Sequence, residues 1–431
     1  MSPKTITKVE ELDLQHTPGG IPVIVDRLHW SRSAAVAVNV SVGSRDEPSG
    51  KNGIAHLLEH LLFKGTELRS SKEMSQQIEA AGGEMNGYTS KELTSYYVST
   101  IDETLPTAEA LLAEMVCRPL IDKKDIKTEK KVVTQEIKMS EDDPEDYSHE
   151  LLVRAIWKGN PMANSEGGQI KDVRGMSQSD IRAFFQDSYR PPYLSVVAAG
   201  NVDTKQMVQW ASENFDGLGS AKKLAKREAP KYHAGIELFP REGEQAYVAM
   251  GLPAVNASHP DRYSYSMVGT MLAAGTSSRL YQKVREENGL VYSIYAQTYP
   301  FTDTGIAGIF FSTSSKNAER VMRIIADELR TFKEKGLEDG ELARAKHWLK
   351  GMIVRKLESA ENRMFFLGQT FAQTGRALSS EEVLERIEGV KEEDISRVAE
   401  KLLDRSQLCI ALHASKKEGG RIAKSVTDLD F

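Results

Sequence analysis

The sequence predicts an α+β fold built from two domains that share one plan. Stretches with alternating apolar and polar residues, typical of strands, are interleaved with stretches of helical periodicity. At 431 residues the chain is too long for one ordinary core. The same order of elements recurs after a polar segment near the middle. We therefore expect one domain at 1–217, a linker at 218–235 and a second domain at 236–431.

The first half opens with predicted strands. "IPVIVD" and "AAVAVNVSVGS" precede residue 45, and valine recurs at every second position from Val36 to Val42. Helical periodicity starts at Gly53 and recurs in "SSKEMSQQIEAAGG", which a serine precedes and a glycine pair ends. The strands "GEMNGYTS" and "LTSYYVST" follow. Helices then dominate 104–157 and cover 178–188, and "LSVVAAGNV" at 194–202 predicts a closing strand.

The second half repeats this order. "GIELFP" and "AYVAMGL" predict strands, helices follow, "LVYSIYAQTYP" and "GIAGIFFSTSS" predict further strands, and long helices come last. "IEAAGGEMNGYTS" from Ile78 and "VREENGLVYSIYA" from Val284 each combine a helix end, a glycine and a strand. Two copies of one domain are the economical interpretation, although periodicity alone also permits two unrelated α+β domains.

Composition narrows the class of protein. With 56 basic and 62 acidic residues the formal net charge is −6, which argues against a nucleic-acid partner. The N-terminal residues contain no apolar stretch typical of a signal peptide, and no window predicts a membrane span. Cys117 and Cys409 form no CxxC pair, so a disulfide framework is not expected. We expect a cytoplasmic protein with no membrane partner.

An unusual helix, "GIAHLLEHLLFKG" at 53–65, carries two histidines and a glutamate among leucines. Residues three and four apart share one face of a helix, so His56, Glu59 and His60 project together. Two histidines at this spacing can hold one zinc ion, and the glutamate remains free to handle a water proton. The order is the HxxEH of some zinc peptidases. The alternative is a pair of core histidines bonded to the backbone or to Glu59.

A catalytic zinc usually has a third protein ligand. The predicted helix "DIKTEKKVVTQEIKMSEDDPED" offers Glu129 and Glu136, seven residues apart and therefore on one face. Glu136 lies beside the apolar Val132, Val133 and Ile137, where an unpaired carboxylate is poorly placed. A salt-bridged surface glutamate is the alternative from this helix alone.

Taken together, these motifs resemble the M16 zinc peptidases, which include pitrilysin, insulin-degrading enzyme and the mitochondrial processing peptidase. The resemblance spans almost the whole chain and is carried by "HLLEH", "FKGT", "NGYTSKELTSYY", "EKKVVTQEI" and "SSRLYQKVREENGLVYSIYA". It implies two homologous domains of the mitochondrial-processing-peptidase type, each an antiparallel-rich sheet with packed helices. It also implies Zn²⁺ bound by His56, His60 and Glu136, with Glu59 as general base and Glu129 supporting a ligand histidine from the second coordination sphere.

The resemblance extends to residues that handle the substrate. It implies that Arg285 and Tyr292, seven apart, bind and polarise the scissile peptide, and that a peptide adds along a strand edge at 83–88, including Asn86 and Gly87. Without the family, Arg285 would be an exposed helix charge, and Tyr292 a strand aromatic of the core.

The function implied is zinc-dependent cleavage of peptides or unfolded segments inside a closed chamber. Because larger relatives build the chamber from four such domains and this chain has two, we expect a homodimer, or a heterodimer with a related subunit. The alternatives are a non-catalytic scaffold or chaperone-like subunit, and a dedicated protease that matures a leader-bearing peptide.

Overall fold

The computed structural model describes residues 11–221 and 224–431. Residues 1–10, which begin the expected first domain and the N-terminal stretch that lacks signal-peptide character, and residues 222 and 223 of the expected linker lie outside the described residues. Across the described residues, no helix combines the length and the apolar character that crossing a bilayer requires.

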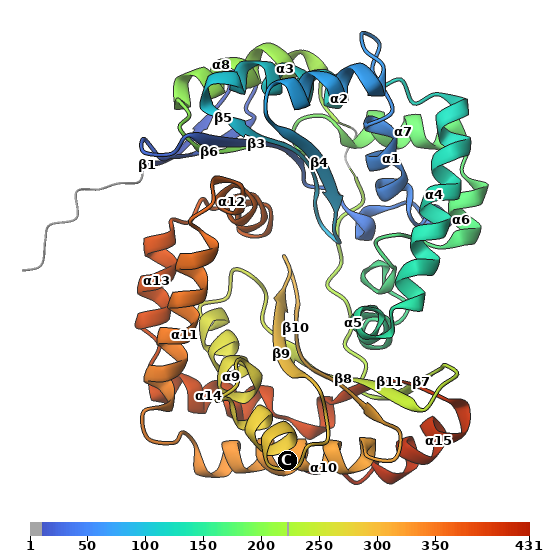
Figure 1. The fold of residues 1–431 in the computed structure, drawn as a ribbon, viewed down its shortest axis with the longest axis vertical. Coiled ribbons are helices and arrows are strands. Elements are labelled where there is room, and N and C mark those ends of the chain that lie inside the picture. The colour runs from blue at the N-terminus through green and yellow to red at the C-terminus, as the bar shows by residue number, and fades with distance from the viewer. Residues whose placement is uncertain (1–10, 222–223) are drawn as a thin grey trace, which may run out of the picture. The chain divides into compact units, whose positions relative to one another are not determined.

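The first sheet has six strands in the order β1-β2-β6-β3-β5-β4 (Figure 1). β2 and β6 run parallel, and the other neighbours are antiparallel. Both β1 and β4 are therefore edge strands. The strands are β1 (Glu11–His16), β2 (Pro22–Arg27), β3 (Ser33–Val40), β4 (Glu84–Thr89), β5 (Thr94–Ile101) and β6 (Leu194–Gly200).

The second sheet, of five strands, repeats the pairing of the first. Its order is β7-β11-β8-β10-β9, with β7 and β11 parallel and all other neighbours antiparallel. These strands correspond in order and direction to β2, β6, β3, β5 and β4, so the expectation of two copies of one plan is confirmed. The strands are β7 (Gly235–Pro240), β8 (Gln245–Ala254), β9 (Ile294–Pro300), β10 (Gly305–Ser314) and β11 (Cys409–Ala414).

Helices account for most of the remaining regular structure. Those of the first half are α1 (Ile54–Leu62), α2 (Ser71–Ala80), α3 (Leu105–Cys117), α4 (Lys123–Asp142), α5 (Pro144–Ile156), α6 (Ile170–Gly175), α7 (Gln178–Ser188) and α8 (Thr204–Phe215). Those of the second half are α9 (Arg262–Ala273), α10 (Ala318–Lys335), α11 (Glu341–Lys356), α12 (Ala360–Thr374), α13 (Ser380–Glu388), α14 (Glu392–Leu402) and α15 (Lys416–Ser425).

The chain forms two compact units that exchange helices. The first unit consists of Met1–Ile137, Asn164–Arg227 and Arg355–Ser379, and the second of the remaining three segments. The expected domains were contiguous in sequence, whereas here α5 of the first half belongs to the second unit, and α12 of the second half belongs to the first. The chain also passes between units at Arg227, within the segment expected as a linker.

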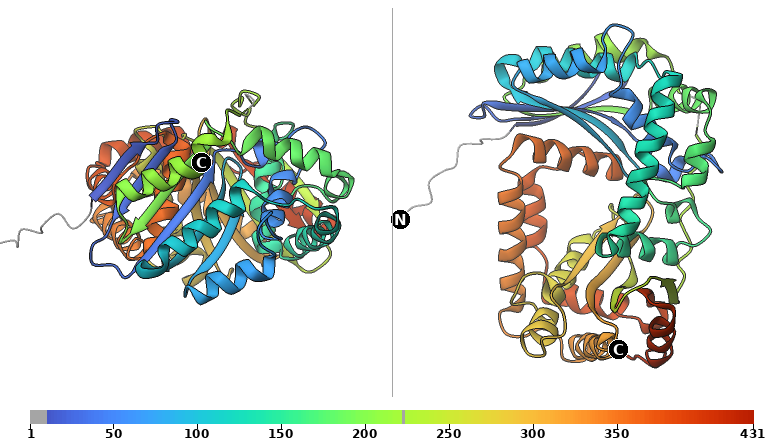
Figure 2. Two further views of the ribbon diagram at one scale, coloured as in Figure 1. Left: turned by 90° about the horizontal axis from the view of Figure 1, so that it is seen from above. Right: turned by 45° about the vertical axis from the view of Figure 1, so that its right-hand side comes forward.

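Alternating side chains explain how the first sheet is covered on both faces. Val36, Val38 and Val40 of β3 point into the core that α1 and α3 cover, whereas Ala35 and Ala37 point to the opposite face. There they pack against α12, through a cluster completed by Ile24, Val197, Ala199, Ala360, Met364 and Leu367. Figure 2 shows α12 and α3 on opposite sides of this sheet.

Helix α5 packs on the second sheet as α12 packs on the first. Leu152 and Ile156 of α5 pack with Ala249 of β8 and Ala411 of β11. The contact is close, because a Cβ added to Gly251 would lie 2.7 Å from the Ile156 side chain. Each exchanged helix thus forms part of the core of the unit that receives it.

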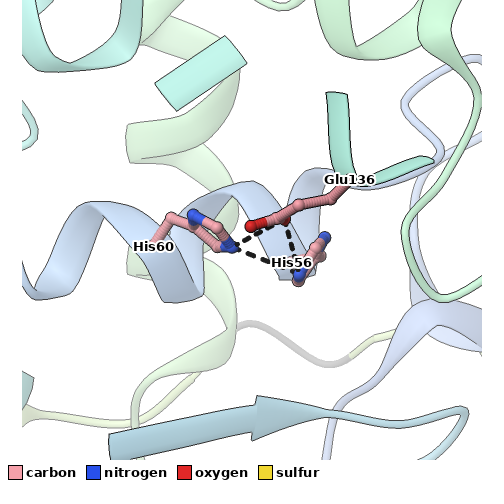
Figure 3. A group of neighbouring side chains, drawn as sticks. All are labelled: His56, His60 and Glu136. Carbon is pink, nitrogen blue, oxygen red and sulfur yellow. Dashed lines mark hydrogen bonds and ion pairs between the residues drawn. The ribbon is translucent and has the colours of Figure 1, made fainter. Parts of the chain in front are cut away.

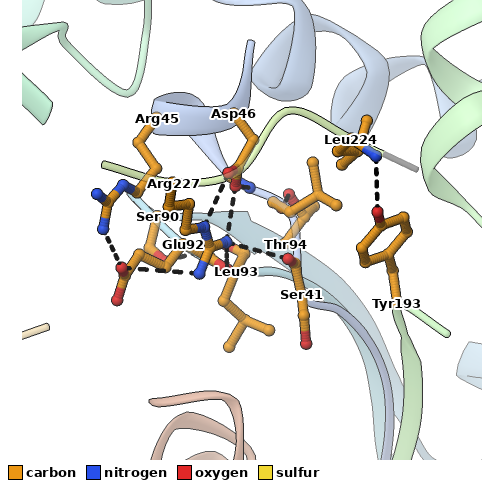
Figure 4. Close-up of polar contacts among 12 residues, drawn as sticks. Ser41, Arg45, Asp46, Ser90, Glu92, Leu93, Thr94, Tyr193, Leu224 and Arg227 are labelled. Atoms are coloured by element: carbon orange, nitrogen blue, oxygen red, sulfur yellow. Dashed lines mark hydrogen bonds and ion pairs between the residues drawn. The ribbon is translucent and has the colours of Figure 1, made fainter. Parts of the chain in front are cut away.

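Ion pairs and hydrogen bonds of Arg227 hold the segment where the chain leaves the first unit (Figure 4). The Arg227 guanidinium donates to both carboxylate oxygens of Asp46, at 2.8 and 2.7 Å, and to the backbone oxygens of Ser41 and Glu92. Asp46 is largely shielded from solvent, and a shielded carboxylate is stable only with such a partner. Glu47, which follows Asp46 in the chain, binds the N-terminal end of α1.

Candidate metal centre

Helix α1 presents one apolar and one polar face. Leu57, Leu58 and Leu61 are fully buried in the first core, and this burial sets which side of the helix faces outward. The start of the helix is held by Glu47, whose two carboxylate oxygens accept the backbone N–H groups of Gly53 (2.8 Å) and Ala55 (3.0 Å). These are orphan donors of the first helical turn, so α1 is firmly anchored where its histidines begin.

The opposite face of α1 meets α4 (Figure 3). His60 Nε2 lies 3.3 Å from His56 Nε2 and 3.3 Å from Glu136 Oε2, and His56 Nε2 lies 3.8 Å from the same carboxylate oxygen. The Glu136 side chain is 42% exposed, so this group of three side chains is open to solvent on one side. The structure brings together the three residues expected as ligands.

The spacing and chemistry of the three donors fit a zinc ion. Zinc binds imidazole nitrogen and carboxylate oxygen at about 2.0–2.2 Å in a tetrahedral arrangement, which places neighbouring donors about 3.3–3.6 Å apart. The observed separations of 3.3, 3.3 and 3.8 Å are close to that range. Glu129 accepts from His60 Nδ1, so a neutral His60 directs a lone pair at Nε2 toward the Glu136 carboxylate. A cation bound between these two acceptors would be held by both of them.

Electrostatics favours the neutral imidazole that metal binding requires. Burial, and next the neighbouring His60, lower the pKa of His56 to about 4. His60 is oriented from behind by Glu129, whose Oε2 lies 3.1 Å from His60 Nδ1 and whose Oε1 lies 2.9 Å from Lys64 Nζ. The Glu129 side chain is only 3% exposed. A carboxylate on the distal nitrogen is a common way to fix a ligand histidine.

Glu59 lies on α1 between the two histidines and is buried. Burial raises the pKa of its carboxyl, and a hydrogen bond from Thr89 opposes this rise. The Thr89 hydroxyl donates to Glu59 Oε2 at 2.6 Å. Glu59 is thus a carboxylate beside the donors of the metal site, in the place suited to a general base.

Comparison with protein families assigns both halves of the chain to one group. The model described as "Insulinase (Peptidase family M16)" matches residues 23–168, and that described as "Peptidase M16 inactive domain" matches residues 175–349. The chain belongs to peptidase family M16. The second match fits the sequence of α9, which takes the place of α1 in the second unit and carries no histidine.

Curated relatives of this M16 chain cover it nearly end to end. An uncharacterized zinc protease of Streptomyces coelicolor is 36% identical over 90% of this chain and 86% of its own length. One of Mycobacterium tuberculosis is also 36% identical, over 93% of each chain. A Bacillus subtilis protein with the same description is 31% identical over 89% of this chain and 93% of its own.

Solved structures confirm the fold of the M16 chain. A protease from Helicobacter pylori superimposes with a TM-score of 0.87 at 21% identity, covering 94% of this chain and 99% of that one. A Pseudomonas fluorescens structure described as a peptidase M16 inactive domain gives a TM-score of 0.86 at 18% identity, covering 94% and 98%. At these identities the likeness is one of fold.

The M16 chain places Asn86 and Gly87 on the open edge of β4. Ser90 N–H donates to Leu93 O at the turn, and hydrogen-bonded pairs alternate along an antiparallel ladder, so the backbone groups of Gly87 point away from β5. The Asn86 side-chain oxygen accepts the Gly87 N–H at 2.8 Å. This edge lies close to Glu59, and the Asn86 amide would have to release the Gly87 N–H before an added strand could pair there.

Arg285 and Tyr292 lie in the second unit. Arg285 is on a π-helical turn at Tyr281–Glu286, and Tyr292 is 84% exposed and precedes β9. The alternative of a core strand aromatic is therefore wrong. The Arg285 guanidinium lies 4.8 Å from the centre of the Tyr292 ring and donates to the Tyr292 carbonyl oxygen, so a half-buried arginine and an exposed tyrosine form one pair.

Two contributors to the site were missed by sequence reasoning. Lys64 lies four residues after His60, and this helical spacing could have indicated a contact with Glu129. Thr89 gave no signal, because its partner Glu59 is thirty positions away and the contact depends on how β4 packs on α1.

Proposed function

We propose that this protein is a zinc-dependent endopeptidase. The observation that carries the proposal is the group formed by His56, His60 and Glu136, with its near-tetrahedral donor spacing, beside the buried carboxylate of Glu59. The names of the curated relatives, uncharacterized zinc proteases, support the metal and the reaction class.

The residues have separate tasks in this reaction. When bound, zinc would act as a Lewis acid toward a water molecule and the peptide carbonyl. His56, His60 and Glu136 would hold the ion, and Glu129 would keep His60 in the binding tautomer. Glu59 takes a proton from the attacking water and passes it to the departing amine, which is general acid–base catalysis by one carboxylate.

The substrates we propose are peptides and unfolded segments. The open edge of β4 offers backbone N–H and C=O groups near Glu59, and only an extended chain can pair with such an edge. A folded protein has few segments free to do so. A dedicated leader-peptide maturation protease would use the same chemistry on one precursor.

The decisive comparison is Glu59→Gln against the unaltered protein, on an unstructured fluorogenic peptide. The substitution removes the base but no metal ligand, so zinc content and thermal unfolding should stay unchanged while kcat falls by about 10²–10⁴-fold. A Glu59→Gln variant as active as the parent would remove the assignment. A parent protein that holds zinc but cleaves none of a panel of unstructured peptides would favour a non-catalytic subunit.

We further propose that the active form is a dimer, in which the zinc residues of one chain act with Arg285 and Tyr292 of another. Both residues can donate hydrogen bonds to a developing oxyanion. Glu59→Gln chains mixed with Arg285→Ala/Tyr292→Phe chains should regain activity, since each mixed dimer contains one intact set. Exchange of chains, shown by a tagged pull-down, without return of activity would contradict the arrangement in trans.

A further inference from the structure

We propose that β4 positions the general base: Thr89 holds the Glu59 carboxylate in its working orientation, and Gly87 leaves the room for it. Thr89 is then a positioning residue, acting on the reaction only through Glu59. This inference rests on the proposed endopeptidase function. It adds to the strand edge a second role, distinct from pairing with a peptide.

Among the described residues, Thr89 supplies the hydrogen bond to the Glu59 side chain. Thr89 Oγ1 donates to Oε2 at 2.6 Å, a short distance that fits a bond to an ionised acceptor. A glutamate has three rotatable bonds, so a single fixed oxygen selects one arrangement of the carboxylate. With Oε2 engaged, Oε1 is left to accept the proton of a water molecule.

Gly87 makes this arrangement possible sterically. A Cβ added at position 87 would lie 3.3 Å from Glu59 Cγ and 3.3 Å from Phe63 Cε2, and 3.0 Å from the Ser95 carbonyl oxygen. Any side chain there would crowd the stem of Glu59. Because successive residues of a strand alternate between faces, Gly87 and Thr89 share the face of β4 that packs on α1. Gly87 leaves space for the Glu59 side chain, and Thr89 supplies the hydrogen-bond donor.

The two residues that position the base therefore lie on the same strand, β4, as the proposed peptide-binding edge, while Glu59 itself lies on α1. A peptide paired with β4 would have its register set by the same strand that sets the direction of the Glu59 carboxylate. A displacement of about 1 Å at a reacting group can lower a rate about a hundredfold. Loss of the Thr89 hydroxyl should accordingly act on kcat, whereas pairing of the peptide with the backbone of β4 should survive.

The test compares Thr89→Val, Thr89→Ser and, as a matched control, Thr298→Val on β9, the equivalent edge strand of the second unit. Valine keeps the branched shape but not the hydroxyl, and serine restores the hydroxyl. Thr89→Val should lower kcat at least about tenfold with KM within about twofold. Thr89→Ser should recover most of kcat, and Thr298→Val should behave like the parent. Zinc content and the unfolding temperature should match the parent in all three.

Two readouts keep the inference separate from the proposed function. If the parent is active and Glu59→Gln is dead, but Thr89→Val has the parent's kcat, the positioning role is wrong and the function stands. A Thr89→Val variant that changes only KM, or a folded Thr89→Ser variant that recovers nothing, would also overturn it. Independently of activity, a crystal structure of Thr89→Val should show the Glu59 carboxylate turned from its present position, and an unmoved carboxylate would contradict the inference.

Discussion

At the scale of single residues, the chain of contacts from Lys64 through Glu129 to His60 shapes the metal site. Glu129 is almost fully buried, and each of its oxygens has one partner. Lys64→Met removes the cation and leaves the buried Glu129 carboxylate without its partner, so Glu129 should hold the His60 imidazole less firmly. We expect zinc affinity to fall by about 10–100-fold, measured by competition with a chelator.

The matched variants for this test are Lys64→Arg and Lys72→Met. Arginine keeps the charge and should recover much of the affinity, while Lys72 is an exposed lysine of α2 whose loss should change nothing. Equal zinc affinity in Lys64→Met and the parent would show that Glu129 holds its position unaided.

The same residues show what a sequence can predict at this scale. His56 and His60 were predictable as a pair because helical periodicity places residues four apart on one face. Glu136 could be predicted as the third ligand only through the family resemblance, since nothing in the local sequence indicates that α4 contacts α1. Gly87 was expected to contact substrate, and the structure adds its contact with Glu59. Such contacts depend on packing between distant segments.

At the scale of elements, two helical glycines should respond oppositely to alanine. Gly269 of α9 has space, because an added Cβ would lie 3.8 Å from Thr298 and 3.9 Å from Ala296. Gly368 of α12 has none, because its Cβ would lie 2.5 Å from the buried Asn39 amide nitrogen on β3. Gly269→Ala should raise the free energy of unfolding by about 0.5–1 kcal/mol. Gly368→Ala should lower it by about 1–3 kcal/mol. Denaturant titration of both variants measures the pair, and a stabilised Gly368→Ala would contradict the close packing of α12.

A buried carboxylate on α3 predicts a pH dependence of stability. Burial raises the pKa of Glu109 from 4.5 to about 7, and its Oε1 has no hydrogen-bond partner among the described residues. A raised folded-state pKa gives stability that is complete below pH 4.5 and is lost as the pH rises through 7. Glu109→Gln does not titrate, so from pH 5 to pH 8 it should gain about 2 kcal/mol relative to the parent. Urea unfolding at both pH values measures this, and a constant difference between the two proteins would contradict it.

Regular elements with strong periodicity were the ones that the sequence predicted well. α7 begins and ends at the expected residues, and α2 follows its expected serine cap. β1 and α8 were not predicted. β1 is a short, exposed edge strand whose apolar residues are only Leu12 and Leu14. The expected strand at 290–300 starts only at Ile294, because the preceding residues follow the π-helical turn that carries Arg285.

At the scale of the whole molecule, the exchange of α5 and α12 predicts that neither half folds alone. A fragment of residues 1–217 lacks α12, so the apolar face formed by Ile24, Ala35 and Val197 would meet water. The fragment should aggregate or unfold without cooperativity, whereas co-expression with 218–431 should recover a soluble complex. Light scattering and thermal unfolding measure both. A monomeric 1–217 fragment with a sharp transition would show that α12 is dispensable.

The exchange could not be predicted, because hydrophobic periodicity reports that a helix has a buried face but not which sheet buries it. The repeat was predictable, since its signal lies in the order of elements along the chain.

The measurement that tests the central claim most directly is the zinc content of the purified protein, by mass spectrometry, with His60→Ala and Glu136→Ala beside the parent. Each substitution removes one of the three donors. A catalytic zinc site of this kind uses three protein ligands, so that only the fourth position stays open for water. We predict about one zinc ion per parent chain and a sharp loss of zinc in both variants, with far-UV circular dichroism unchanged. Full zinc occupancy in folded His60→Ala and Glu136→Ala proteins, or none in the parent after growth with added zinc, would contradict the assignment of this site.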